Sequence, residues 1–299
     1  MNLLREKLAK YDAPQRAKAA GIYPYFREIQ SDQDTEVIIG GKKVLMFGSN
    51  SYLGLTNHPK VKEAAMEAIR KYGTGCAGSR FLNGTLDIHV QLEKRLAKFV
   101  GKEDAISFST GFQVNEGVIS CITGREDYLI WDELNHAFII EGIRLSFSNK
   151  LKYKHNDMES LEKQLRRCEP DKVKLIVTDG VFSIERDMAH VTEIVRLAKQ
   201  YNASIMVDEA HGIGVLGNHG RGTCDHFERI RAPAPLSSAA GRGRLSASRY
   251  GWHWRRTTQA APSRRWPATG ANDSEAYRAE RRPFRNNPHA TRPPAPRTR

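Results

Sequence analysis

The stretch SIMVDEAHGIGVLG (residues 204–217) combines an apolar run with acidic and imidazole side chains. Ser204–Val207 reads as a buried strand that ends at Asp208, and His211 follows in a glycine-rich turn. A carboxylate on a nearly all-apolar strand needs a partner, because burying an unpaired charge is costly. The protonated nitrogen of a cofactor ring is one such partner. A metal ion bound by Asp208, Glu209 and His211 is the alternative.

Outward from this stretch, the hydrophobic period switches repeatedly between that of a helix and that of a strand. Helices are predicted at 59–73, 86–101, 111–123, 136–147, 157–168 and 190–201, and strands at 105–110, 127–132, 150–155, 173–183 and 204–211. Alternating strands and helices predict an α/β fold, with a mostly parallel sheet covered by helices on both faces. Ligands of such sheets bind outside the carboxyl ends of the strands, where the polar motifs of this chain lie.

The segment STGFQVN (109–115) follows one predicted strand and opens a helix. The first-turn amides of that helix, at Gly111 and Phe112, have no helical partner and favour a phosphate group. An ordinary Ser/Thr helix cap explains the same residues equally well.

Two further motifs stand at strand ends. DELNHAF (132–138) places His136 where an imidazole can stack on a flat ring or pair with Asp132 or Glu133. TDGVFSIERD (178–187) places Ser183 where it can reach a ring hydroxyl, although turn chemistry explains a serine there as well.

One glycine motif is a decoy. GTGCAG (73–78) matches the dinucleotide fingerprint G-x-G-x-x-G, but it follows a predicted helix. The fingerprint works only between a strand and a helix. We therefore expect a glycine-rich loop beside the active site.

The charge of the chain is unevenly distributed. Residues 1–227 hold 31 Lys and Arg against 30 Asp and Glu, whereas residues 228–299 hold 16 Arg, no Lys and four acidic residues. The last segment has nine of the 13 Pro and few Ile, Leu or Val, so it cannot bury enough apolar surface to offset the entropy of ordering. We expect an N-terminal segment (1–58), a partial large domain (59–227) and a disordered tail (228–299).

Cysteine spacing and hydropathy indicate the compartment. The four cysteines have neither metal-ligand nor redox spacing, so reduced thiols are expected. The first residues lack an apolar signal core, and no apolar run approaches the roughly 20 residues that span a bilayer. We therefore predict a cytoplasmic protein without a metal site.

Taken together, the motifs SNSYLGL (49–55), YGTGCAGSRFLNGT (72–85), STGF, NHA, DGVFS and VDEAHGIGVLG resemble those of the α-oxoamine synthases. These fold-type I enzymes of the aminotransferase class I/II superfamily use pyridoxal 5′-phosphate (PLP). They condense an amino acid with an acyl-CoA and release carbon dioxide. The likeness runs to Phe227 and is greatest to the bacterial serine palmitoyltransferases, which make sphingoid bases. Glycine C-acetyltransferases and 8-amino-7-oxononanoate synthases are its neighbours.

The resemblance implies a cofactor site. Gly111 and Phe112 would hold the phosphate through their amides, and His136 would stack on the pyridine ring. Asp208 would pair with the ring nitrogen, with His211 beside it. By this resemblance His136, Asp208 and His211 are the catalytic residues.

The same resemblance implies contacts to the ring oxygen and to substrates. Ser183 and His211 would hydrogen-bond the ring oxygen. Asn50 and Tyr52 would line the entrance, and Arg80 would lie near the substrates, which are serine or glycine and an acyl-CoA. The family forms homodimers, but the strands missing after residue 211 argue against that assembly here.

Three departures from the family pattern stand out. Phe138 replaces a small residue, and Arg186 replaces a glycine, which predicts backbone strain. The family's Schiff-base lysine should follow VDEAH, yet the last lysine of this chain is Lys199. Because the likeness stops within one residue at Glu228, we interpret the tail as a shifted reading frame and expect an inactive chain.

Two other functions are weighed. One is that of a non-catalytic partner subunit, because such subunits of this family also lack the lysine. They keep the remaining strands and the small domain, however, and this chain is expected to have neither. The tail, with Trp252, Trp254 and Trp266 among its arginines, could instead bind nucleic acid by phosphate contact and stacking. Arginine-rich disorder binds polyanions whatever its origin, so a nucleic-acid partner is not expected.

Overall fold

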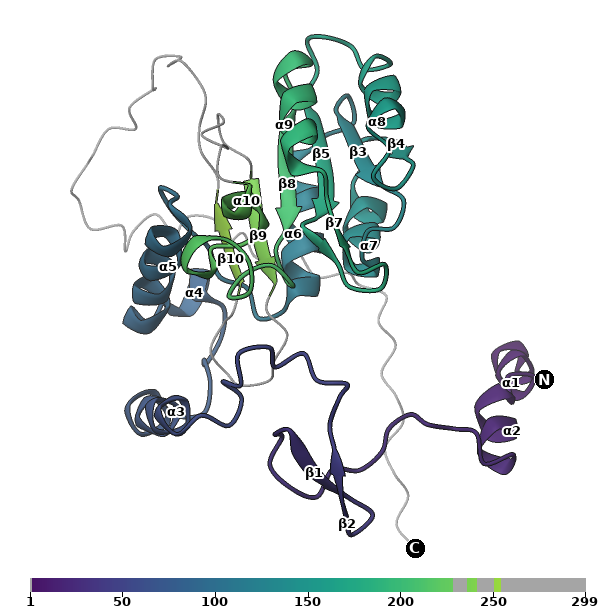
Figure 1. Ribbon diagram of the computed structural model, residues 1–299, viewed down its shortest axis with the longest axis vertical. Coiled ribbons are helices and arrows are strands. Elements are labelled where there is room, and N and C mark those ends of the chain that lie inside the picture. Colours follow the sequence, from purple (N-terminus) through teal and green to yellow (C-terminus); the bar gives the residue numbers. More distant parts are fainter. Residues whose placement is uncertain (1, 228–235, 241–249, 254–299) are drawn as a thin grey trace, which may run out of the picture. The chain divides into compact units, whose positions relative to one another are not determined.

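The computed structural model describes residues 2–227, 236–240 and 250–253 (Figure 1). Its helices are α1 Leu3–Ala9, α2 Ala13–Ala19, α3 Pro59–Tyr72, α4 Arg80–Asn83, α5 Asp87–Val100, α6 Gly111–Ile122, α7 Ala137–Leu145, α8 Met158–Leu165, α9 Val191–Gln200 and α10 Thr223–His226, with the 3-10 turn Asn218–Gly220. Its strands are β1 Glu36–Ile39, β2 Lys42–Leu45, β3 Tyr128–Asp132, β4 Asn149–Tyr153, β5 Lys174–Asp179, β6 Val181–Phe182, β7 Asp187–Met188, β8 Ser204–Asp208, β9 Leu236–Ala240 and β10 Tyr250–His253.

A six-stranded sheet forms the centre of the fold, in the order β10-β9-β8-β5-β3-β4. Neighbouring strands are parallel from β4 to β9, and only β10 runs antiparallel to its neighbour. The register places Asp179 of β5 beside Asp208 of β8. The predicted mostly parallel α/β sheet is therefore confirmed, and its carboxyl edge carries acidic residues.

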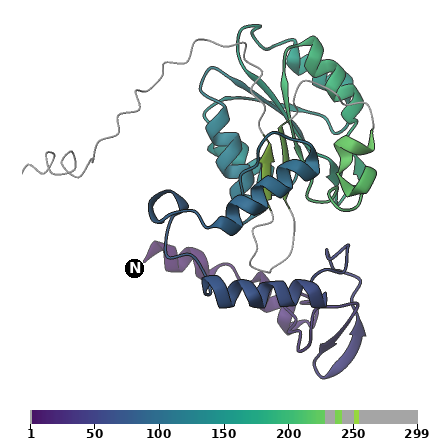
Figure 2. The same ribbon diagram turned by 90° about the vertical axis from the view of Figure 1, so that its left-hand side faces the viewer.

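Each face of the sheet has its own apolar core. On one face, Ile130 and Ile176 pack with α8 and α9 residues such as Leu161 and Ile194. On the other face, strand residues including Leu129 pack with α6 and α7. Successive strand side chains point to opposite faces, so strands buried on both faces read as continuous apolar runs. Figure 2 shows the sheet between the green helix α9 and the bluer helices α6 and α7.

The predicted strand at 105–110 is wrong. Residues 105–110 form no strand: only Ser107 takes part in a single β-bridge, and helix α6 follows at Gly111. Side chains take the amides that a strand partner would need, because Asp104 accepts from the Ala105 amide at 2.8 Å and Glu93 accepts from the Ser107 amide at 2.8 Å. A local acceptor, Asp104, and one on helix α5, Glu93, thus take backbone amides that a strand ladder would use.

Two segments of the predicted disordered tail differ from that expectation. Leu236–Ala240 pairs parallel with β8, with Leu236 opposite Met206, and Tyr250–His253 pairs antiparallel with β9. A parallel neighbour needs only main-chain groups from the added strand, so an arginine-rich composition does not prevent it. The other residues of the tail, Trp254 and Trp266 included, lie outside the described residues.

The N-terminal segment contains short elements that its sequence pattern did not predict. Helices α1 and α2 have seven residues each, and β1 pairs with β2 in a hairpin. GTGCAG follows α3 and precedes α4, so it does not stand between a strand and a helix as a dinucleotide site requires. No helix among the described residues is long and apolar enough to cross a membrane.

Candidate functional site

Asp208 ends β8 with its side chain buried at the carboxyl edge of the sheet. Its carboxylate accepts from the side-chain amide of Asn115 at 2.9 Å and from the Ala210 backbone at 3.0 Å. The Asn115 amide also donates to the Gly111 carbonyl at 3.3 Å. The Asn115 side chain therefore connects Asp208, predicted to pair with the ring nitrogen, to the start of α6, predicted to bind the phosphate.

A second buried acid lies beside Asp208. Asp179 accepts from the His136 backbone amide at 2.7 Å, and its own amide donates to Asn135 at 3.0 Å. Burial raises the pKa of Asp179 well above its ordinary value, and the adjacent Asp208 carboxylate raises it further. The pair can hold a proton between strands β5 and β8, because two buried carboxylates do not both ionise easily.

His211 meets the N-terminal motif. Its Nδ1 shares a 2.7 Å hydrogen bond with the Tyr52 hydroxyl, which also donates to Asn50 Oδ1 at 3.2 Å. Leu53 lies under Gly214, where an added methyl group would come within 2.7 Å of its Cδ1. Residues 159 positions apart, Tyr52 and His211, are thus brought together at one place in the fold.

Glu209 has a structural role. Its carboxylate is buried and accepts from the Thr223 amide and hydroxyl, both at 2.9 Å, and from the Cys224 amide at 3.0 Å. No group of three potential metal ligands occurs among the described residues. The hydrogen bonds of Glu209 to the start of α10 argue against the metal alternative for Asp208, Glu209 and His211.

The start of α6 shows both predicted features. Thr110 caps the helix by accepting from the Gln113 amide at 3.1 Å. The amides of Gly111 and Phe112 have no hydrogen-bond partner within residues 2–227. Because Thr110 caps one amide and leaves two others, the cap and an anion site are compatible.

Three aromatic rings continue from this helix end. His136 caps α7, with its Nδ1 accepting from the Phe138 amide at 3.2 Å. The Phe138 ring packs edge-on against His136 at 4.5 Å between centroids and against Phe112 at 5.2 Å. The departure at Phe138 thus fills space between two residues predicted to hold the cofactor.

Asp132 pairs with His155 rather than with His136, which was one of the two alternatives for His136. His155 Nδ1 lies 2.9 Å from an Asp132 oxygen, and the His155 amide donates to Glu133 at 3.2 Å. The proposed pairing of these acids with His136 missed His155, because His155 reaches them from the end of the neighbouring strand β4.

Ser183 lies in the four-residue turn between β6 and β7 and is exposed. Within residues 2–227 its side chain has no hydrogen bond to Asp208 or His211. Arg186 in the same turn has a φ of 65°, which confirms the strain predicted where the family has glycine.

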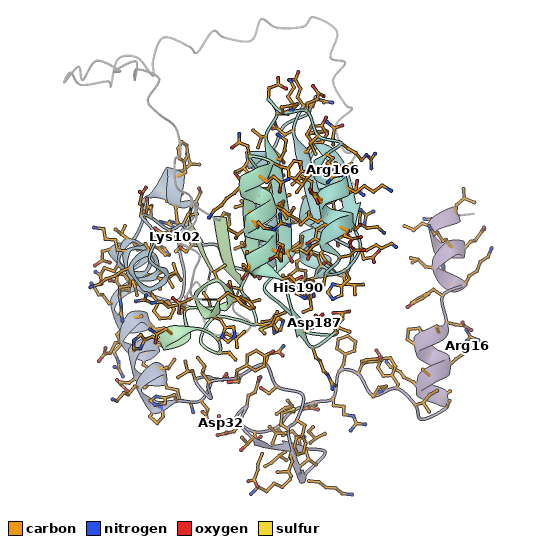
Figure 3. All side chains as sticks on the ribbon, turned by 45° about the horizontal axis from the view of Figure 1, so that its top comes forward. Arg16, Asp32, Lys102, Arg166, Asp187 and His190 are labelled. Atoms are coloured by element: carbon orange, nitrogen blue, oxygen red, sulfur yellow. The ribbon has the colours of Figure 1, made fainter. Side chains whose placement is uncertain are left out.

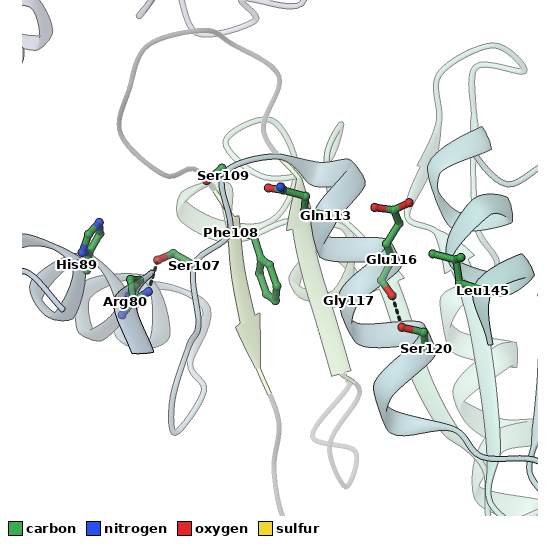
Figure 4. A pocket seen from close by; sticks show the side chains of 10 residues that line it. All are labelled: Arg80, His89, Ser107, Phe108, Ser109, Gln113, Glu116, Gly117, Ser120 and Leu145. Carbon is green, nitrogen blue, oxygen red and sulfur yellow. Dashed lines mark hydrogen bonds between the residues drawn. The ribbon is translucent and has the colours of Figure 1, made fainter. Parts of the chain in front are cut away.

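Arg80 is placed apart from these residues. It forms a two-point ion pair with Glu93, at 2.7 and 3.0 Å, and donates to Ser107 at 3.2 Å. It lines a cavity of about 580 Å³ that runs along α6 past Gln113 and Glu116 (Figure 4). Among the described residues it makes no hydrogen bond to Asp208, His211 or Tyr52.

The sequence analysis did not identify Asn115, which binds Asp208, Glu209 as an acceptor for the start of α10, or His155, which binds Asp132 next to the site. Asn115 carried a usable signal, because it is a polar residue four positions after Gly111 on an apolar helix face. His155 and Glu209 carried none, since their partners come from other strands and loops.

The buried acid, the two open amides and the buried Asn115 Oδ1, which has no partner among the described residues, fit a ligand with a basic ring nitrogen and a phosphate. Fold and site together define the class of α/β proteins that hold such a cofactor at the carboxyl edge of a parallel sheet. The chain belongs to the aminotransferase class I and II family, whose model matches residues 42–235.

Within this family, the chain is similar to proteins of two named activities. A serine palmitoyltransferase of Bacteroides thetaiotaomicron is 67% identical over 227 residues, which are 76% of this chain and 58% of that protein. An 8-amino-7-oxononanoate synthase of Thermosipho melanesiensis is 48% identical over 210 residues, 70% of this chain and 54% of that protein. A solved structure of serine palmitoyltransferase with PLP matches with a TM-score of 0.76 at 34% identity, over 80% of this chain and 60% of that chain. The chain thus spans little more than half the length of these curated relatives.

Proposed function

We propose that this chain is the PLP-binding part of an acyltransferase of the serine palmitoyltransferase type, which condenses serine or glycine with an acyl-CoA and releases carbon dioxide. The observation that carries the proposal is the bridge from Gly111 through Asn115 to Asp208. Asn115, one helical turn after Gly111, thus connects the helix end that carries the open amides to the buried carboxylate on β8, as binding of a phosphate and a ring nitrogen on one molecule requires.

The residues at the helix end and on β8 would bind the two poles of the cofactor. The amides of Gly111 and Phe112 bind the phosphate, with the helix dipole favouring its negative charge. Asp208, oriented by Asn115, keeps the ring nitrogen protonated. When bound, PLP supplies an electron sink for the α-carbon of the amino acid.

The remaining residues would orient the ring and admit substrate. His136, whose Nδ1 accepts a hydrogen bond from the Phe138 amide, would stack on the ring. Ser183 and His211, the latter hydrogen-bonded to Tyr52, would donate hydrogen bonds to the ring oxygen. Asn50 and Tyr52 line the entrance for the amino acid. Arg80 reaches the substrate only if it releases Glu93, because both its terminal nitrogens are engaged.

The sequence contains no lysine after Lys199 to form the covalent link to PLP. We propose that the chain binds PLP without that link and does not turn over. In an intact relative the lysine would also accept the α-proton, so its loss removes base and nucleophile together.

A titration tests cofactor binding. Purified protein is titrated with PLP and followed by absorbance and by quenching of tryptophan fluorescence. Asp208→Asn should weaken binding at least about tenfold, because the ring nitrogen loses its charged partner. The control Asp171→Asn changes an exposed acid before β5 and should leave the affinity unchanged. Equal affinities of Asp208→Asn and the unaltered chain would contradict the assigned role.

An activity assay and resequencing test the rest. With serine and palmitoyl-CoA, this chain should release no CoA thiol.

The coding DNA around codons 220–235 is then sequenced and translated in all three frames. A frame that continues with a Ser-Lys segment, and whose product releases CoA, supports the proposal. Release of CoA by the present chain would contradict it.

A further inference from the structure

One histidine outside the cofactor site bridges two acids. His155 lies in the loop after β4, with a side chain 19% exposed. Its Nδ1 is 2.9 Å from Asp132 at the end of β3, and its Nε2 is 3.0 Å from Asp187 on β7. The ring also packs edge-on against Phe182 at 4.5 Å between centroids. A single imidazole therefore joins the sheet to both strands of the β6–β7 hairpin.

Apart from Phe182, whose side chain is buried in the apolar core of the sheet, the hairpin has few attachments. Each of its strands is only two residues long. Its turn, residues 183–186, is exposed and contains Arg186 with its strained backbone. Its base is held by the Gly180 amide, which donates to the Asp208 carbonyl at 2.8 Å, and by the Ala189 amide, which donates to the Gly180 carbonyl at 3.1 Å. A two-pair hairpin is not stable alone, so side-chain contacts must hold it.

Asn156, next to His155, reinforces the same junction. Its backbone amide donates to Asp132 at 2.9 Å, and its side-chain amide donates to Asp187 at 3.0 Å. Its φ of 50° places it in the left-handed region, which aims both groups at the acids. Figure 3 shows Asp187 at the same end of the sheet as His190 and at the opposite end from Arg166.

We propose that His155 is a positioning residue that clamps the β6–β7 hairpin to the sheet and so sets the place of Ser183 beside the cofactor ring. Ser183 directly follows Phe182, the residue on which the His155 ring packs. The part that concerns Ser183 rests on the proposed function. The clamp itself does not.

The clamp depends on charge. When both ring nitrogens are protonated, each donates to a carboxylate; the neutral ring can donate to only one of them. Burial disfavours the protonated ring, but hydrogen bonds to Asp132 and Asp187 outweigh it, so the pKa of His155 lies above its ordinary value of 6.5. Two further charged groups lie close by. Glu133 accepts a hydrogen bond from the His155 backbone amide, and Lys152 Nζ lies 3.9 Å from the Glu133 carboxylate. The clamp is complete below pH 6.5 and is lost as the pH rises through the raised pKa.

Hydrogen exchange tests the clamp without cofactor. The amides of residues 181–189 are followed by mass spectrometry from pH 5.5 to 9 and are corrected for intrinsic exchange rates. Protection of this peptide should fall on the order of tenfold as the pH rises, because a charge-assisted hydrogen bond is lost. His155→Gln should show the lower protection already at pH 5.5, without the pH step. The control His190→Gln changes an exposed histidine at the start of α9 and should keep the step.

Two results would overturn the clamp: protection that is independent of pH in the unaltered chain, or an equal loss of the step in His190→Gln. Circular dichroism of His155→Gln guards against general unfolding. If that variant unfolds, Asp187→Asn, which removes one acceptor at a half-exposed position, replaces it and should abolish the same step.

PLP titration of the same proteins tests the role of Ser183. His155→Gln and Ser183→Ala should each weaken PLP binding severalfold, and the double variant should weaken it no more than the stronger single one. Additive losses would contradict positioning through Ser183. Absence of PLP binding in the unaltered chain would contradict the proposed function, while the exchange experiment would still decide whether His155 clamps the hairpin.

Discussion

The α/β sandwich and the N-terminal region bury their apolar residues very differently. The sandwich, residues 107–227, buries most of the large apolar side chains of its strands, such as Leu129, Ile130 and Ile176. Within the described residues 2–104, only Val37 and Ala97 are buried apolar residues. The sandwich therefore has a core of its own, whereas the N-terminal region is ordered by contacts such as Tyr52 with His211. The site needs both regions, but only one can stabilise itself.

The largest effect should come from the sandwich core. Ile176→Ala should lower the free energy of unfolding by about 2–5 kcal/mol, because Ile176 is fully buried between β3, β8 and the α8–α9 layer. The matched change in the N-terminal region, Leu82→Ala, removes a side chain that is 80% exposed and should cost less than about 0.5 kcal/mol. Urea unfolding followed by circular dichroism measures both. Similar losses would show that the N-terminal region has a core as well.

A smaller effect is expected at a glycine. A methyl group at Gly212 would meet the Glu209 carboxylate and come within 2.8 Å of Thr223 Oγ1. Gly212→Ala should therefore cost about 1–3 kcal/mol through overpacking. Gly75→Ala is the control in the N-terminal region, because no atom lies within 4 Å of its added methyl group. The same urea titration applies, and a Gly75→Ala loss as large as that of Gly212→Ala would contradict the comparison.

The smallest effect concerns the contact between the regions. Tyr52→Phe removes the hydroxyl that joins Asn50 to His211, and a single hydrogen bond contributes about 0.5–1.5 kcal/mol. Tyr25→Phe changes a tyrosine that is 67% exposed and should be neutral. Hydrogen exchange of residues 49–55 should rise in the first variant only. Unchanged exchange there would mean that Leu53 under Gly214, not the hydroxyl, holds the motif.

The same difference explains what the sequence could predict. Strands β3, β5 and β8 and helices α6 and α9 were predictable, because burial on fixed faces imposes a regular apolar period. The hairpin β1–β2 and the seven-residue helices α1 and α2 have no buried face beyond Val37, so no period marks them. The strand expected at 105–110 failed because Asp104 and Glu93 take its amides.

Predictability of the site follows a related division. Residues of the motifs were identified one by one, and the structure joins Asn50, Tyr52 and His211, and links Gly111 with Asp208. Which acid pairs with which histidine was not predictable. Asp132 pairs with His155, and not with His136 as one of the two alternatives had it, because β4 lies parallel beside β3, a neighbourhood that only the assembled sheet defines.

The pairing of β9 with β8 has a consequence for self-association. It makes β8 an interior strand, so the sheet ends at β4 on one side and at β10 on the other. Exposed sheet edges recruit strands from other molecules, and lysines on an edge oppose this. Lys150 and Lys152 are exposed on β4 and guard that edge. Within the six-stranded sheet of the described residues, strand addition is therefore expected at the four-residue strand β10 rather than at β4.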